Sequence, residues 1–134
     1  MFFVRSCVHI LLDRVSIQDT ISVEKVAEDS LRTVEFRRLF DDKNAARVSF
    51  ELERDQVLGF VVQLECRFNG EWVPVVRYDT HHGFAHRDIL HPSHEPTKTE
   101  MPVRDYNEGL TFAINDLRAH WETYRRRYEE WEEK

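Results

Sequence analysis

The chain has 134 residues, a length that fits one domain and excludes two of ordinary size. Its formal charge of −6 makes it a poor general binder of polyanions, because phosphate contacts need clustered Lys and Arg, although a local basic patch is compatible with that total. Cys7 and Cys66 form no CxxC pair, which is typical of a reducing cytoplasm and favours burial. No stretch reaches the roughly 20 apolar residues of a membrane span. The sequence therefore predicts a cytoplasmic protein that does not enter membranes.

Strand patterns begin only after an unclear N-terminal segment. Residues 1–30 are interpreted as an N-terminal extension, and 31–134 as a single domain. Thr33–Phe40 is rich in β-branched and aromatic residues, which predicts a first strand. Apolar and polar residues alternate in Arg47–Glu53 and again in Gly59–Phe68, the period-2 pattern of half-buried strands.

Two further strands are predicted around short turns. Asn69-Gly70 supplies the two positive-φ positions of a type I′ hairpin turn, so Trp72–Tyr78 returns beside the preceding strand. Pro74 lacks a backbone donor and belongs at an edge or a bulge of the sheet. Asp79–Gly83 is a second turn, and Phe84–Leu90 is the strand after it. Strands joined by such short turns run antiparallel.

A loop and a long helix complete the expected fold. His91–Arg104 contains three prolines and is predicted to be a loop. Asp105 followed by Glu108 resembles a capping box, and the apolar residues from Leu110 to Trp131 recur at alternating steps of three and four, which predicts a helix over Asp105–Glu130. The fold class is therefore α+β: an antiparallel sheet of about four to five strands in a meander, packed against one long C-terminal helix.

The length of this helix suggests a surface for a partner. It would be about 39 Å long, whereas a strand of seven residues spans about 23 Å, so the sheet is expected to leave the end of the stripe uncovered. Residues 1–30 could cover it, or a second copy of the chain or another protein could do so. The candidate partner-binding residues are Trp121, Tyr124, Tyr128 and Trp131.

The candidate chemistry is concentrated in one short segment. It contains five of the seven histidines, His81, His82, His86, His91 and His94, and among or next to these lie Arg77, Tyr78, Asp79, Arg87 and Asp88. Pairing Tyr78 with Phe84 across the turn would put His86 and Asp88 on their face of the sheet and both arginines on the other; a one-residue slip would change this sorting.

Three interpretations of this segment remain open. Clustered imidazoles bind metals, but the spacing matches no HExxH or Cys/His pattern, so no metal or other cofactor is expected. The second interpretation is structural, because His and Asp cap turns and Arg pairs with carboxylates. The third is acid–base chemistry on a phosphodiester, with histidine moving protons and arginine holding phosphate. The catalytic candidates are His86, His82, Arg77, Arg87, Asp79, Asp88 and Tyr78.

The run from Val75 to Pro92, VVRYDTHHGFAHRDILHP, resembles the signature of a family of small uncharacterised prokaryotic proteins that form a domain of unknown function. More distantly, the strand Val34–Phe40, the Arg-Tyr-Asp core and the histidines after it are similar to TumE-like toxins of toxin–antitoxin pairs. That resemblance implies a toxin that acts on RNA and is bound by an antitoxin-like partner. The leading hypothesis is thus metal-independent His/Arg chemistry on RNA, with His86 and His82 as the acid–base pair. The alternative is a non-enzymatic protein that dimerises or binds a partner through its C-terminal helix.

Overall fold

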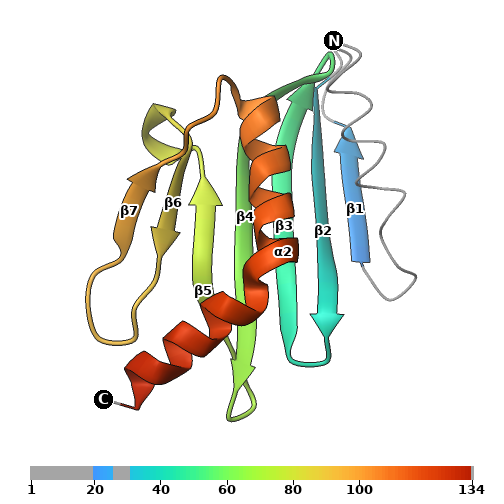
Figure 1. The fold of residues 1–134 in the computed structure, drawn as a ribbon. Coiled ribbons are helices and arrows are strands. Elements are labelled where there is room, and N and C mark those ends of the chain that lie inside the picture. The colour runs from blue at the N-terminus through green and yellow to red at the C-terminus, as the bar shows by residue number, and fades with distance from the viewer. Residues whose placement is uncertain (1–19, 26–30, 134) are drawn as a thin grey trace.

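The computed structural model describes residues 20–25 and 31–133, which form seven strands and a long helix (Figure 1). The strands make one antiparallel sheet, and their order across the sheet is their order along the chain. The elements are β1 Thr20–Lys25, β2 Leu31–Asp41, β3 Asn44–Glu53, β4 Gln56–Phe68, β5 Glu71–Asp79, β6 His86–Ile89, β7 Thr97–Glu100 and α2 Tyr106–Glu132, with a 3-10 turn, η1, at His81–Gly83. The predicted α+β meander with a C-terminal helix is confirmed.

Tight turns fix the register of the central strands. Asn69 and Gly70 have φ angles of 52° and 82°, the paired positive values of the predicted type I′ turn between β4 and β5. Arg54 and Asp55, between β3 and β4, have φ angles of 48° and 67° and reverse the chain in the same way. The β2–β3 turn is closed by Asp41, whose Oδ1 accepts a hydrogen bond from the Lys43 amide at 2.8 Å. These short connections leave neighbouring strands with little freedom to slip.

Helix α2 begins where the sequence predicts. The Asp105 carboxylate caps it by accepting a hydrogen bond from the Glu108 amide at 2.8 Å. The Glu108 carboxylate accepts from Arg104 Nε, also at 2.8 Å. Asp105 therefore caps the helix, while the Glu108 side chain binds Arg104, the residue before the cap.

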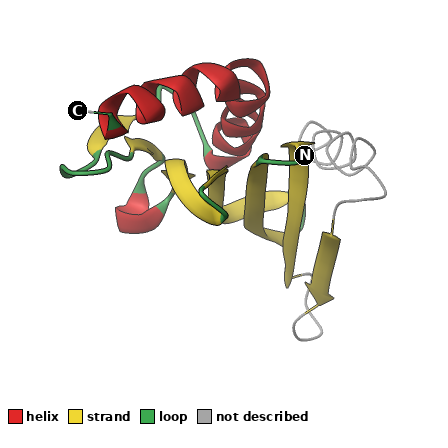
Figure 2. Cartoon of the chain, turned by 90° about the horizontal axis from the view of Figure 1, so that it is seen from below, coloured by secondary structure: helices red, strands yellow, loops and turns green. Residues whose placement is uncertain are grey.

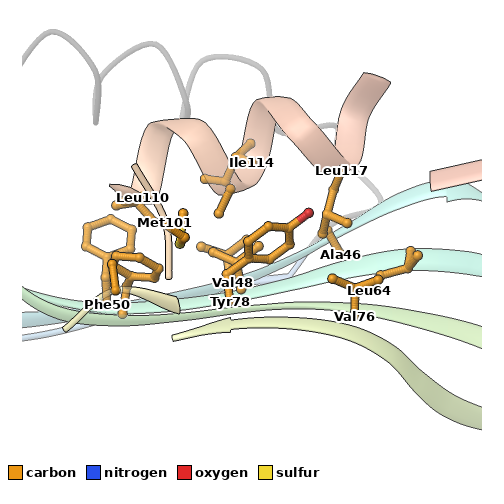
Figure 3. Packing of buried hydrophobic residues seen from close by; sticks show 14 of the residues in the cluster. Ala46, Val48, Phe50, Leu64, Val76, Tyr78, Met101, Leu110, Ile114 and Leu117 are labelled. Carbon is orange, nitrogen blue, oxygen red and sulfur yellow. The ribbon is translucent and has the colours of Figure 1, made fainter. Parts of the chain in front are cut away.

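The core lies between α2 and one face of the sheet. Leu110, Ile114 and Leu117 of the helix point toward the strands (Figure 3). The sheet side is formed by alternate residues, among them Val48, Phe50, Leu64, Val76 and Tyr78. Burying each such side chain contributes about 1.5–3 kcal/mol. Below, this side of the sheet is the helix face, and the opposite side, which carries Ser49, Val61, Asp79 and His86, is the open face (Figure 2).

The prediction of four to five strands was too low. Strand β1 lies within residues 1–30, which the sequence analysis treated as an extension, and β7 lies within the predicted loop His91–Arg104. All four residues of β7 are exposed polar residues, so no apolar alternation marks it. Its pairing with β6 rests on the backbone, a kind of strand that hydrophobic patterning cannot detect.

The expectation that aromatic residues of the helix extend beyond the sheet was wrong. Strand β4 has 13 residues and spans about 43 Å, and the 27-residue helix spans about 40 Å, so the two match in length. The helix also bends as it crosses the sheet (Figure 1). Each candidate partner-binding side chain packs within the chain: Trp121 stacks on Phe40, Tyr124 is 7% exposed, Tyr128 stacks on Phe68, and Trp131 stacks on His91. The exposed aromatic row on which a partner surface depended is absent from the described part of the helix.

Two smaller expectations concern cysteine and membranes. Cys66 is fully buried, as predicted, and burial raises the pKa of its thiol to about 12, which makes it unreactive. Cys7 lies outside the described residues. Within the described ranges, no helix combines the length and apolar character needed to cross a membrane.

Candidate functional site

The hairpin β5–β6 carries the predicted site residues, but in a different register. Tyr78 pairs with Arg87, whereas the sequence analysis paired it with Phe84. The difference is three residues, and an odd shift exchanges the two faces of a strand. Arg87 therefore joins Tyr78 on the helix face. The open face receives Arg77, Asp79, His86 and Asp88.

The reason for this register is the shape of the connection. It runs from Thr80 to Ala85, longer than the predicted turn, and its reversal is made by His82 and Gly83, with φ angles of 76° and 87°. The Ala85 carbonyl is held outside the β5–β6 ladder by the Met101 amide, which donates to it at 3.0 Å. A left-handed conformation is strained for a residue with a side chain, and such strain is common at functional sites.

His86 is the centre of a polar cluster on the open face. Its side chain is 1% exposed, and its Nε2 lies 3.0 Å from Asp79 Oδ1 and 3.8 Å from Asp88 Oδ2. Its Nδ1 lies 3.2 Å from the Phe84 carbonyl oxygen. Both ring nitrogens are thus engaged within the protein, which fixes the ring in place.

A positive charge already lies beside these carboxylates. Lys98 Nζ is 3.4 Å from His86 Nε2 and 3.8 Å from Asp88 Oδ1. One ligand atom from each of Asp79, His86 and Asp88 lies within 4.8 Å of the others, and this donor set suits a divalent cation. The Lys98 ammonium therefore offsets the charge of Asp88 and lies beside the same imidazole nitrogen, where a metal ion would bind.

Two exposed imidazoles border this cluster. The rings of His81 and His82 are 4.3 Å apart, and the His82 ring is 6.3 Å from that of His86. The His81 amide donates to Asp79 Oδ1 at 2.9 Å, so the carboxylate that faces His86 also holds the turn. The open face is hollowed here by a depression of about 810 Å³, whose polar lining includes Thr33, Ser49, Glu51, Arg77, Asp79, Thr80, His81 and His82.

The other half of the motif forms a closed network on the helix face. Asp116 Oδ2 accepts hydrogen bonds from the hydroxyls of Tyr78 and Tyr124, the second at 2.6 Å. Arg87 Nη1 donates to Tyr124 at 3.1 Å and lies 3.8 Å from the same carboxylate. Burial, and next the bond to Asp116, raises the pKa of both tyrosines. His120 Nδ1 lies 3.1 Å from Asp116 Oδ1.

The seven catalytic candidates are therefore divided between two faces of the sheet. Five lie on the open face or in the turn beside it: Arg77, Asp79, His82, His86 and Asp88. Tyr78 and Arg87 lie on the helix face and do not reach the depression. Lys98 and Asp116 were not among the predicted site residues, because Lys98 lies in a predicted loop and the one signal of Asp116 is a charge next to the apolar stripe of the helix.

Fold and site together define a small α+β protein with a His/Asp/Arg cluster on one face of an antiparallel sheet. The chain belongs to a domain-of-unknown-function family, DUF7718, whose family model matches residues 28–134. The resemblance inferred from the run Val75–Pro92 is thereby confirmed for this family, whereas none of the comparisons shows a similarity to TumE-like toxins. No curated protein and no solved structure matches the chain.

Proposed function

We propose that the protein cleaves RNA in the depression on the open face. The observation that supports this is the convergence of two exposed imidazoles, an exposed guanidinium and the Asp79 carboxylate, which is fixed by His86, around one hollow. Imidazoles move protons near neutral pH, and a guanidinium binds phosphate with two parallel hydrogen bonds. RNA suits these groups because its 2′-hydroxyl is a nucleophile placed next to each phosphodiester.

The geometry favours particular roles. His81 and His82 are exposed and adjacent, so they are the proton-transfer pair. One imidazole accepts the 2′-hydroxyl proton while the O2′–P bond forms, and the other, protonated, gives its proton to the 5′-oxygen as the P–O5′ bond breaks. The products are a 2′,3′-cyclic phosphate and a free 5′-hydroxyl. Arg77 lines the depression and would neutralise the charge that develops on phosphorus-bound oxygen.

His86 and Asp79 have a positioning role in this proposal. His86 is buried with both ring nitrogens engaged, so it does not contact the RNA directly. Asp79 Oδ1 faces the His86 ring and accepts from the His81 amide, and it thereby ties the strand β6 to the turn that carries His81 and His82. Tyr78 and Arg87 are left out because they lie on the helix face.

The direct test is cleavage of a labelled RNA oligonucleotide by the purified protein. His82→Ala should slow cleavage by about 10²- to 10⁴-fold, the usual loss when a general acid or base is removed. His94→Ala is the matched control, since His94 is also exposed and its ring lies against that of His91, 4.3 Å away, rather than lining the depression. Addition of EDTA should leave the rate unchanged. Full activity of His82→Ala, or loss of activity with EDTA, would contradict the proposal.

A protein that cleaved cellular RNA without restraint would stop growth. The resemblance to TumE-like toxins therefore favours a toxin that an antitoxin-like protein holds inactive. Induced expression should arrest growth, and His82→Ala should remove the arrest while leaving the amount of folded protein unchanged. Arrest that persists in the folded variant would separate toxicity from this site.

A further inference from the structure

The open face carries a row of cations that runs across the strands. Arg37 pairs with Arg47, Arg47 with Gln63, and Gln63 with Arg77 in successive ladders from β2 to β5. The row continues through Asp88 of β6 to Lys98 of β7. We call Arg37, Arg47, Arg77 and Lys98 the basic row. With strands about 4.8 Å apart, it extends over about 24 Å.

This row is unusual for a chain with a net charge of −6. Arg37 and Arg47 lie directly opposite each other, a pairing of like charges that destabilises a sheet. Glu65 compensates in part, since its carboxylate lies 3.0 Å from Arg47 Nε and 4.0 Å from Arg37 Nε. Among the row and the carboxylates that contact it, Glu65 and Asp88 are two negative charges against four cations, so the positive excess is confined to the row itself. Arg47 is 60% exposed and Lys98 46% exposed, so an anion can reach them.

An aromatic side chain lies beside the row. The guanidinium of Arg37 is 4.2 Å from the centroid of the Trp72 ring, and Trp72 is 37% exposed. Aromatic rings next to cations are the usual platform for the unpaired bases of single-stranded nucleic acid. Arg77, in turn, donates from Nε to Gln63 at 2.9 Å, which holds its side chain along the row.

We infer that the basic row binds the phosphate backbone of single-stranded RNA, which crosses the strands with a base stacked on Trp72. This inference rests on the proposed function and names how its substrate is held. The next row of the sheet contains the acidic residues Glu35, Asp79 and Glu100, which repel phosphate and confine the RNA backbone to the basic row. At about 3.4 Å per stacked nucleotide, the basic row accommodates about seven nucleotides. Arg77, which lines the depression, puts the scissile phosphate next to His81 and His82.

The inference is tested by binding, separately from cleavage. Fluorescence anisotropy with a 12-nucleotide single-stranded RNA and the cleavage-inactive His82→Ala protein gives Kd as a function of salt. Four phosphate contacts predict a slope of about −3 for log K against log salt, since each contributes about 0.7 on a single strand. Arg47→Gln and Arg77→Gln should each weaken binding severalfold and reduce the slope by about 0.7. Arg126→Gln, an exposed arginine on α2, is the matched control and should bind like the parent.

The stacking of a base on Trp72 is tested separately, with the variant Trp72→Ala. Trp72→Ala should weaken binding about tenfold with an unchanged salt slope, because a base loses its platform while the cations remain. RNA cleavage that proceeds normally in Arg47→Gln and Trp72→Ala, with unchanged binding, would overturn the inference and leave the proposed function standing. RNA that binds along this row but is never cleaved would support the inference and refute the proposed function. Tighter binding of a duplex of the same length would overturn the single-strand assignment, because paired bases cannot stack on Trp72.

Discussion

The two faces of the β5–β6 hairpin use neighbouring residues of one motif for different purposes. On the helix face, Tyr78 and Arg87 are joined to Asp116 and Tyr124 in a network that locks α2 onto the sheet. On the open face, Asp79 and His86 pair beneath two exposed imidazoles. Successive residues of a strand point to opposite faces, so a run of adjacent polar residues is divided between them.

The comparison shows that a motif continuous in sequence need not be one site in space. Of the three residues Arg-Tyr-Asp, Tyr78 faces the core, whereas Arg77 and Asp79 line the depression. Replacing a helix-face residue should therefore cost stability, and replacing an open-face residue should cost activity.

The largest effect on stability is expected from Asp116→Ala. It leaves the hydroxyls of Tyr78 and Tyr124 and the Arg87 guanidinium without their shared acceptor in a buried setting, which should lower the free energy of unfolding by about 3–5 kcal/mol. Urea denaturation measures this loss. Asn115→Ala, at the exposed neighbouring position, is the control and should change stability little. RNA cleavage per folded molecule should be unchanged; a stable Asp116→Ala protein would contradict the network's role.

The second largest effect is a loss of folding stability at alkaline pH, caused by buried groups on the helix face. Burial raises the pKa of Cys66 from 9.0 to about 12, and it also raises the pKa of Tyr78 and Tyr124. Above the unfolded pKa, the unfolded chain releases protons that the folded chain retains, so stability is fully present below pH 9.0 and falls as pH rises. Cys66 alone contributes up to about 1.4 kcal/mol for each pH unit between 9.0 and about 12. Thermal melts from pH 7 to 11 should show this decline, and Cys66→Ala should flatten it; identical slopes in the two proteins would refute the assignment.

Smaller effects are expected from two glycines that can be compared directly. Gly83 in the site turn and Gly70 in the β4–β5 turn have φ angles of 87° and 82°, and in both cases an added Cβ meets no described atom within 4 Å. Gly83→Ala and Gly70→Ala should each cost about 1 kcal/mol from backbone strain alone. Gly83→Ala should also slow RNA cleavage, because it shifts His81 and His82, whereas Gly70→Ala should not. Equal activity of the two variants would argue against a positioned turn.

The smallest effect is expected at Lys98. Its ammonium is about half exposed, so Lys98→Ala should cost less than about 1 kcal/mol, and added salt should reduce the difference. Stoichiometric Zn²⁺ should not raise the melting temperature of the parent protein, because the ammonium already neutralises Asp88 and lies against His86. A rise of several degrees in the parent would instead identify a metal centre at Asp79, His86 and Asp88.

The fold was predictable where local patterns are strong. Alternation in β3 and β4, the Asn69-Gly70 turn and the Asp105 cap each follow from short-range chemistry. Strand β7 was not predictable, since its pairing depends on backbone hydrogen bonds and its side chains are all polar and exposed.

The candidate site was predictable in composition and less so in geometry. The segment that carries it was identified from its histidines, but the register of β5–β6 depends on His82 adopting a left-handed conformation, which few residues other than glycine do. Asp116 is distant in sequence from Tyr78, and the basic row combines residues from separate strands. Such contacts exist only once the sheet has formed.

The tryptophans offer the most direct test of the division between faces. The chain has three: Trp72 on the open face, and Trp121 and Trp131 on α2. Titrating ¹⁵N-labelled His82→Ala protein with single-stranded RNA and following the indole N–H signals by NMR reports both faces at once. The account predicts that the Trp72 signal shifts while those of Trp121 and Trp131 stay in place. Shifts confined to Trp121 and Trp131 would contradict it and assign RNA binding to the helix.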